Sequence, residues 1–361
     1  MTPYITKLLR EFVSCPSYVD LDSGITESKF ADLLSLHLSR ILPHHNQGKI
    51  YIDKNRYNLL VLPKEPQVLF CCHLDTVPPV HLPLTTKVTG DAFFGLGSKD
   101  MKGGIVSALV ARAQLSKQDK EKVGFLFYCD EEGTQRGIEA MLDVTLPKSI
   151  QYFFCPESRF NLGVGCRGYM ILELECTGIS AHTARPEQGI NAIEKAYTIA
   201  RNFTLFIKKL SRHNSCTIVN ISGGGSANKV PSMCALTLSC RIISPLSRKA
   251  IQTKVKELAK TSGLKKLVIK KMLIRPPSIE APESLVRTFK KAALAAGFHI
   301  QNADPKRGGY NDIALLSAKH GIPFLNFGPF GEGNHGPNEY VSLQSIADTA
   351  QVLEKVLCDN I

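Results

Sequence analysis

The stretch KVGFLFYCDEEGTQRG, residues 122–137, joins a run of apolar residues to three consecutive carboxylates. The apolar run is typical of a strand buried inside a sheet. Asp130, Glu131 and Glu132 follow it directly. Like charges this close repel one another, and burial raises the pKa values of their carboxyl groups further. Because a nearby cation would relieve this repulsion, the stretch predicts that other cation ligands occur elsewhere in the chain.

Strand-like and helix-like segments alternate around this stretch. Buried strands are expected at 67–75, 122–130 and 150–158, and helices at 102–115 and 135–143. This alternation predicts an α/β domain with a mostly parallel sheet. In such sheets, binding and catalytic groups collect at the carboxyl ends of the strands.

Acidic and imidazole side chains follow the expected strands at those ends. His73 and Asp75 lie in HLDTVP, Glu131 and Glu132 in DEEG, and Glu157 in PES. Residues i and i+2 of a strand share a face, so Asp75 can accept a hydrogen bond from His73 and orient its ring. Taken alone, HLDTVP also fits an ordinary histidine at a strand end, and DEEG also fits a solvated acidic turn.

Two loops supply further ligands. In GLGSKDMKGG, residues 95–104, Asp100 precedes a helix, where it would repel a phosphate, and the loop does not match G-x-x-x-x-G-K-[ST]. We therefore expect Asp100 to bind a cation. His335 lies in GEGNHGPNEY, residues 331–340. Nitrogen and oxygen ligands without thiolate suit zinc, cobalt or manganese, and five ligands fit two ions bridged by one carboxylate.

A second unit is expected to interrupt the first. From Gly168 onward the patterns read β-α-β-β-α-β, the order of a ferredoxin-like α+β domain. We expect a first part of the catalytic domain at 1–166, the inserted domain at 167–275 and the second catalytic part at 276–361. A basic segment at 247–271 is interpreted as a solvated helix face, with a nucleic-acid stripe as the alternative.

Composition sets the broad class. The chain has 361 residues, enough for about two domains, with 43% hydrophobic and 21% charged residues. It contains no apolar run of about 18 residues, so no membrane span is expected. The 11 scattered cysteines are interpreted as free thiols of a cytoplasmic protein. A net charge of +12 suits nucleic acid, acidic partners or anionic substrates.

The series HLDTVP, GLGSKDMKGG, DEEG, PES and the late His335 resembles the M20 family of metallohydrolases over nearly the whole chain, in the same order. The resemblance implies two divalent metal ions, Zn²⁺ in preference to Co²⁺ or Mn²⁺. It implies that Glu131 is the general base and that Asp75 orients His73. The implied ligands are His73, Asp100 and Glu157 for one ion, and Asp100, Glu132 and His335 for the other.

The inserted domain resembles the lid of that family, which also forms its dimer interface. The resemblance implies a homodimer in which His182, in SAHTARPEQGINAI, stabilises the oxyanion in the partner's site. It implies that Asn228 and Arg241 hold a substrate carboxylate and that Gly309 belongs to a glycine-rich substrate loop.

These features predict a dinuclear amidohydrolase that deacylates a small anionic N-acyl amino acid, of the acetylornithine deacetylase or succinyl-diaminopimelate desuccinylase type. An M20-type dipeptidase or carboxypeptidase is the first alternative. A metal-bearing binding protein without catalysis is the second, although it would not need an uncoordinated Glu131. No nucleic-acid partner is expected; binding through 247–271 would instead weaken steeply with salt.

Overall fold

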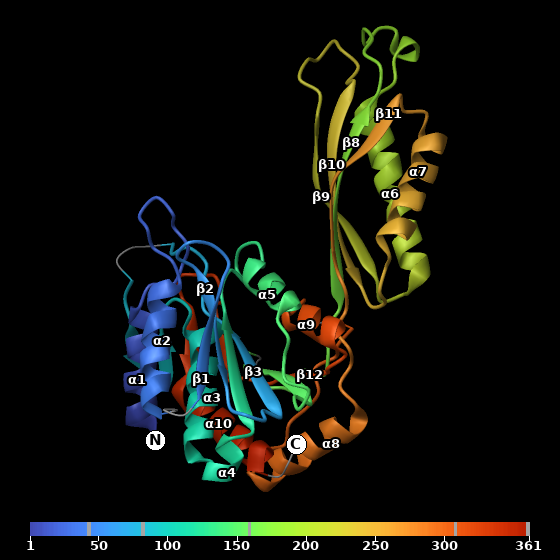
Figure 1. Cartoon of the computed structure of the whole chain (residues 1–361). Coiled ribbons are helices and arrows are strands. Elements are labelled where there is room, and N and C mark those ends of the chain that lie inside the picture. Colours follow the sequence, from blue (N-terminus) through green and yellow to red (C-terminus); the bar gives the residue numbers. More distant parts are fainter. Residues whose placement is uncertain (42–44, 81–83, 158–159, 307–308, 359–361) are drawn as a thin grey trace. The chain divides into compact units, whose positions relative to one another are not determined.

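The computed structural model describes residues 1–41, 45–80, 84–157, 160–306 and 309–358 (Figure 1). The chain divides into two compact units. The first comprises Met1–Gly165, Ser278–Asp304 and Asn311–Ile361, and the second comprises Cys166–Pro277 and Pro305–Tyr310. The short segment Pro305–Tyr310, which the sequence analysis assigned to the catalytic domain, therefore groups with the second unit.

A six-stranded sheet with the order β1-β2-β6-β3-β7-β12 forms the centre of the first unit. The strands β6, β3, β7 and β12 run parallel, which confirms the predicted mostly parallel sheet, whereas β1 and β2 add antiparallel to its edge. The sequence analysis missed these two edge strands. The strand bounds are β1 Asn46–Tyr51, β2 Tyr57–Leu62, β3 Val68–His73, β6 Val123–Tyr128, β7 Tyr152–Cys155 and β12 Phe324–Asn326.

The interior of this sheet is aromatic. Every residue of β3, β6 and β7 is buried, as expected for strands covered on both faces. The ring of Phe70 lies 5.5 Å from that of Phe125 and 5.0 Å from that of Phe154, so one aromatic side chain from each of the three strands packs together. This packing fixes the relative register of the strands whose ends carry the acidic side chains.

Helices surround the sheet of the first unit. Helix α10 packs against α3 and α8, and Figure 1 shows α3 and α10 on one side of the sheet and α5 on the other. The helix expected at 135–143 is shorter, because α5 gives way to a 3₁₀ turn at Met141–Asp143. The helix bounds are α1 Thr2–Ser14, α2 Ser28–Ile41, α3 Gly103–Gln114, α4 Lys117–Lys120, α5 Arg136–Ala140, α8 Glu283–Ala295, α9 Ile313–His320 and α10 Leu343–Cys358.

A small antiparallel sheet, which the sequence analysis did not predict, joins two distant parts of the first unit. Its order is β13-β14-β5-β4, with β4 Lys87–Thr89, β5 Ala92–Phe94, β13 Gly331–Glu332 and β14 Tyr340–Ser342. Strand β14 pairs with β5, so the loop that carries His335 is fixed beside the glycine-rich segment that precedes Asp100.

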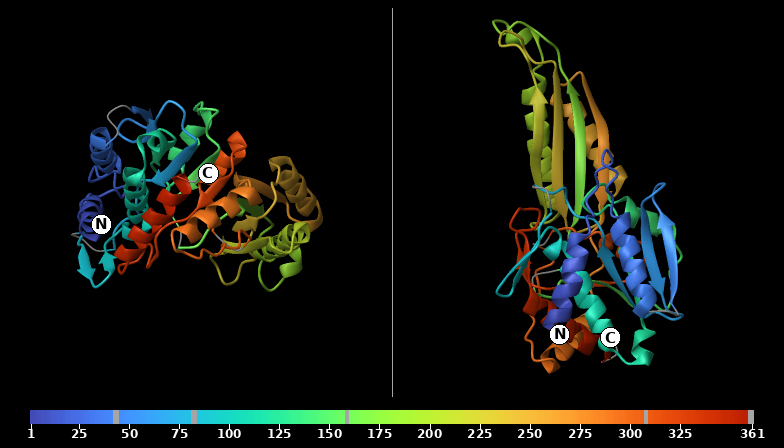
Figure 2. Two further views of the ribbon diagram at one scale, coloured as in Figure 1. Left: turned by 90° about the horizontal axis from the view of Figure 1, so that it is seen from below. Right: turned by 90° about the vertical axis from the view of Figure 1, so that its left-hand side faces the viewer.

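The second unit has the element order β-α-β-β-α-β and a fully antiparallel sheet with the strand order β11-β8-β10-β9. Helices α6 and α7 cover one face of this sheet, as Figures 1 and 2 show. Asn191 caps α6 and Ser247 caps α7 with side-chain hydrogen bonds to main-chain amides. The bounds are β8 Gly168–Thr177, α6 Ala192–Leu210, β9 Ser215–Gly223, β10 Met233–Ile242, α7 Arg248–Ser262 and β11 Lys266–Arg275.

All 11 cysteines are free thiols, and most of them are buried. Among the described residues, no helix is both long and apolar enough to cross a membrane.

Candidate metal centre

The parallel strands bring three predicted ligand segments to one edge of the first unit. His73 is the last residue of β3, Glu131 and Glu132 follow β6, and Glu157 follows β7. Strand β3 pairs with both β6 and β7. The carboxyl ends of these neighbouring parallel strands therefore meet, as the sequence predicted.

Asp100 and His335 complete two groups of ligand atoms at this edge. The atoms offered by His73, Asp100 and Glu157 all lie within 4.8 Å of one another, and so do those of Asp100, Glu132 and His335. Asp100 belongs to both groups. Its Oδ1 lies 2.9 Å from His73 Nε2, and its Oδ2 lies 3.4 Å from His335 Nε2. One carboxylate thus faces two imidazoles.

The His73 ring is held by the main chain. Its Nδ1 lies 3.0 Å from the carbonyl oxygen of Asp75, whereas the Asp75 carboxylate oxygen lies 3.8 Å away. That carboxylate instead accepts hydrogen bonds from the amides of Glu131 at 3.0 Å and Glu132 at 2.9 Å. Asp75 therefore contacts His73 through its carbonyl and fixes the acidic turn through its side chain. A proton held at Nδ1 leaves Nε2 free to bind an ion.

Asp130, the first of the three consecutive acids after β6, belongs to a buried ionic cluster. Arg56 donates to Asp130 Oδ1 at 2.6 Å and to Glu27 Oε1 at 3.0 Å. Hydrogen bonds from Thr134 and Arg56 outweigh burial and lower the pKa of Asp130. Asp130 has a φ of 66°, so it forms the turn that carries the next two acids. Sequence reasoning missed Arg56 and Glu27, which lie far from any recognised motif.

Glu339 is a second residue that sequence reasoning missed. It is 2% exposed, and its carboxylate accepts hydrogen bonds from the amides of Gly97 at 2.8 Å and of Lys99 and Asp100 at 2.9 Å. In the same loop, Asn334 donates to Asp100 Oδ2 at 2.9 Å. The 331–340 loop therefore contributes His335 and also holds the turn that carries Asp100. Nothing in the sequence GPNEY marks Glu339 as a buried acid.

Burial dominates the electrostatics of the acids. It raises the pKa of Glu131 well above its usual range, with repulsion from Asp312 and Glu157 adding to the effect. Burial also raises the pKa of Glu157, and that of Glu132 to about 7. The pKa of His335 rises to about 9, first through its hydrogen bond with Asp100. Burial and mutual repulsion therefore disfavour the charged forms of these acids, and a bound cation would relieve both effects.

This donor set fits divalent cations. Each three-residue group offers one imidazole nitrogen and two carboxylate oxygens, a set that leaves coordination positions open for water or substrate on zinc and similar ions. Glu131 groups with His73 and Glu132 within the same distance limit. A carboxylate that lies beside a bound ion without coordinating it is suited to proton transfer.

The four other predicted site residues lie in the second unit. The 181–184 and 228–230 loops pair: the Thr183 amide donates to the Asn228 carbonyl at 3.1 Å, so His182 and Asn228 belong to adjacent loops. Arg241 lies on β10, with its guanidinium 5.3 Å from the centre of the Tyr169 ring. Gly309 is exposed, and the preceding part of its loop, 307–308, lies outside the described residues.

Known proteins resemble this chain along its length. The family model described as peptidase family M20/M25/M40 matches residues 69–359. The succinyl-diaminopimelate desuccinylase of Methylococcus capsulatus is 25% identical over 352 residues, covering 91% of this chain and 93% of that protein. The aminopeptidase PepT from Bacillus cereus shares the fold with a TM-score of 0.81 at 19% identity, over 99% of this chain and 98% of that one.

A Bacillus subtilis structure described as a dinuclear metal-binding peptidase of the M20 family also shares the fold, with a TM-score of 0.68 at 15% identity. The similarity extends over 99% of this chain and 97% of the Bacillus subtilis chain. The similarities support a metal-binding hydrolase that acts on amide bonds.

Proposed function

The chain belongs to peptidase family M20/M25/M40, and we propose that it removes the acyl group from N-acyl amino acids at a centre of two divalent cations. One observation carries the proposal: two three-ligand groups share Asp100 and lie at the edge of the sheet that also carries Glu131. In the proposal, His73, Asp100 and Glu157 hold one ion, and Asp100, Glu132 and His335 hold the other. Zinc suits these ligands best, with cobalt or manganese as substitutes.

When bound, the two cations lower the pKa of a water molecule and polarise the scissile carbonyl. Glu131 accepts the proton of the attacking water and then donates it to the nitrogen of the leaving amine. Its position suits this work, because its carboxylate lies within 4.8 Å of the ligand atoms of His73 and Glu132 and so can carry a proton close to the reacting groups. Asp75 holds the amides of Glu131 and Glu132 in place and, through its carbonyl, the ring of His73.

The second unit supplies the remaining groups in this proposal. It acts as a lid and dimerisation domain, and His182 of one protomer stabilises the oxyanion at its partner's metal centre. Its exposed ring and its place in a loop support this role. Asn228 and Arg241 bind the substrate carboxylate, and Gly309 lets the main chain approach the substrate. The 11 free thiols suit a reducing cytoplasm.

A peptidase acting on dipeptides or on carboxyl-terminal residues is the second candidate. The same centre would hydrolyse a peptide bond by the same steps, and the similarity in fold to an aminopeptidase favours keeping this alternative. The two activities differ in the group attached to the scissile nitrogen and carbonyl, so substrate specificity separates them.

A substrate panel tests the function. The purified protein is supplied with Zn²⁺, Co²⁺ or Mn²⁺ and assayed on N-acetyl and N-succinyl amino acids and on dipeptides. Metal-dependent release of free amine from the N-acyl amino acids is expected, and removal of the metal by a chelator abolishes it. Turnover of dipeptides alone would support the peptidase, and no turnover with any metal would refute both functions.

A further inference from the structure

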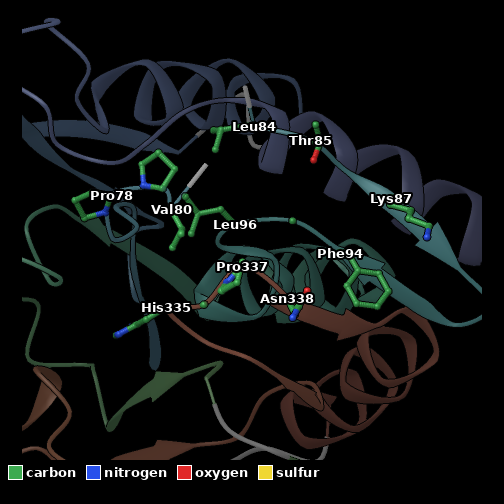
Figure 3. Close-up of a pocket in the computed structure, with 13 residues that line it drawn as sticks. Pro78, Val80, Leu84, Thr85, Lys87, Phe94, Leu96, His335, Pro337 and Asn338 are labelled. Atoms are coloured by element: carbon green, nitrogen blue, oxygen red, sulfur yellow. The ribbon is translucent and has the colours of Figure 1, made fainter. Parts of the chain in front are cut away.

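A pocket of about 360 Å³ lies within the first unit, and its lining includes the proposed metal ligand His335 (Figure 3). Two segments far apart in the sequence line it: the residues that follow HLDTV, and the loop of His335. Most lining side chains are apolar. They are Pro78, Pro79, Val80, Leu84, Phe94, Leu96 and Pro337.

The pocket adjoins the proposed centre at one residue, His335. Pro78 lies three residues after Asp75, and His335 is both a proposed ligand and a lining residue. The small sheet holds the walls together through the pairing of Phe94 with Tyr340, and the Gly95 amide donates to the Glu339 carbonyl at 3.1 Å. The pocket and the proposed centre therefore share the His335 loop as a common wall.

The walls of the pocket are rigid and mostly apolar. The prolines restrict the main chain, so this part of the surface is formed before a ligand binds. None of the described lining residues carries a carboxylate, and the polar ones among them are Thr85, Lys87, His335 and Asn338. Figure 3 shows Lys87 at one end of the pocket and His335 at the other. The pocket thus offers an apolar surface with basic groups at its ends.

We propose that this pocket is a specificity subsite for an apolar group of the substrate, on one side of the scissile amide. The inference rests on the proposed function, because it places the amide at the metal centre. An apolar side chain or acyl chain buries its surface against Val80, Leu84 and Leu96. A chain ending in an ammonium group would lose its hydration there without a carboxylate partner among the described lining residues.

An apolar subsite would restrict the substrates of the enzyme to those with an apolar group near the scissile amide. It favours N-acyl amino acids or peptides with an apolar residue such as leucine over substrates with a cationic side chain such as N-acetylornithine. Burying an additional apolar group in a fitted pocket changes kcat/KM by about 10-fold or more.

The test compares N-acetylglycine, N-acetylleucine, N-acetylornithine and N-hexanoylglycine on the metal-loaded wild type and on Val80→Asp. Val80 is 59% exposed, so the substitution places a charge at the pocket without disturbing the core. We expect the wild type to prefer an apolar substrate over N-acetylglycine by about 10-fold or more, and Val80→Asp to lose that preference. Preference for N-acetylleucine assigns the pocket to the amine side, and preference for N-hexanoylglycine assigns it to the acyl side.

The matched control is Leu36→Asp, which changes an apolar residue on α2 that is 52% exposed and should keep the preference. Saturation-transfer NMR with the same ligands supplies a readout that needs no turnover. If nothing is hydrolysed but N-acetylleucine or N-hexanoylglycine still binds and Val80→Asp removes that binding, the deacylase proposal fails and the subsite stands. Equal kcat/KM values and equal binding for all four ligands would overturn the subsite. So would a Val80→Asp variant that loses as much activity on N-acetylglycine as on the apolar substrates.

Discussion

The carboxylate of Glu339 accepts a hydrogen bond of 2.9 Å from the main-chain amide of Asp100, 239 residues away in the sequence. The two residues are joined at the point where the glycine-rich turn meets the His335 loop. Because Glu339 also accepts hydrogen bonds from the amides of Gly97 and Lys99, it fixes the turn that carries Asp100, the proposed shared ligand. Residues that orient a ligand strongly influence metal affinity.

Glu339→Ala should therefore weaken metal binding by about 10- to 100-fold, because Asp100 loses the anchor of its turn. Titration of the apoprotein with Zn²⁺ against a competing chelator measures this affinity. Glu339→Gln keeps one acceptor oxygen and should recover part of the loss. Glu332→Gln, an exposed acid in the same loop, serves as the control. Unchanged affinity in Glu339→Ala would refute the positioning role.

Glu131→Ala should reduce kcat by a factor of about 10² or more, as expected for the loss of a general base. Both ions should remain bound, because Glu131 belongs to neither proposed three-ligand group. Elemental analysis together with steady-state kinetics checks both statements. Glu65→Ala, at an exposed loop position, is the control. Near-wild-type turnover in Glu131→Ala would remove its assignment as the proton carrier.

His182→Ala should also reduce kcat by about 10² or more, because the oxyanion loses a hydrogen-bond donor. If the histidine acts across a dimer, mixing His182→Ala with Glu131→Ala subunits should restore part of the activity, since one site of each mixed dimer contains both groups. Activity is measured after the subunits have exchanged, and each variant alone serves as the reference. An inactive mixture that contains verified mixed dimers would place the histidine in its own chain's site.

Arg56→Met should destabilise the fold by about 3–5 kcal/mol, because it leaves the buried carboxylates of Glu27 and Asp130 without their partner. Urea unfolding followed by circular dichroism measures the change. Combining it with Glu27→Gln should recover part of the stability by removing one of the uncompensated charges. Arg287→Met breaks an exposed ion pair with Glu283 and should cost at most about 1 kcal/mol. If Arg56→Met and Arg287→Met lowered the free energy of unfolding by similar amounts, the role of the buried cluster would be contradicted.

Tyr57 predicts a specific dependence of stability on alkaline pH. Burial, followed by its hydrogen bond to Asp32, raises the pKa of the Tyr57 phenol to about 12, compared with about 10 in an unfolded chain. Above pH ~10 the unfolded state releases the phenol proton first, so this contribution to stability is complete below pH ~10 and is lost as the pH rises towards 12.

Urea unfolding at a series of pH values should therefore show the stability advantage of wild type over Tyr57→Phe shrinking between pH 10 and 12. Tyr4→Phe, which changes an exposed tyrosine, should show no such trend. A pH-independent difference between wild type and Tyr57→Phe would contradict the assignment.

The sequence by itself determined the mostly parallel sheet and the strand ends that carry His73, Glu132 and Glu157. Apolar runs bounded by acids and glycines are local patterns, and parallel strands bring their carboxyl ends to one edge whatever the loops between them do. The sequence also predicts the order β-α-β-β-α-β of the second unit, because the alternation of apolar and polar residues in strands and their spacing in helices are local patterns.

Only the tertiary structure decided how the candidate centre is supported. The pairing of β5 with β14 brings the His335 loop to Asp100, and the buried Glu339 and Arg56 hold the two turns. The hydrophobic periodicity of the sequence does not predict such contacts, because a buried charged residue is recognised only from the partners that compensate its desolvation. The division of work at Asp75, with its carbonyl facing His73 and its carboxylate facing two amides, likewise depends on distances between separate strands.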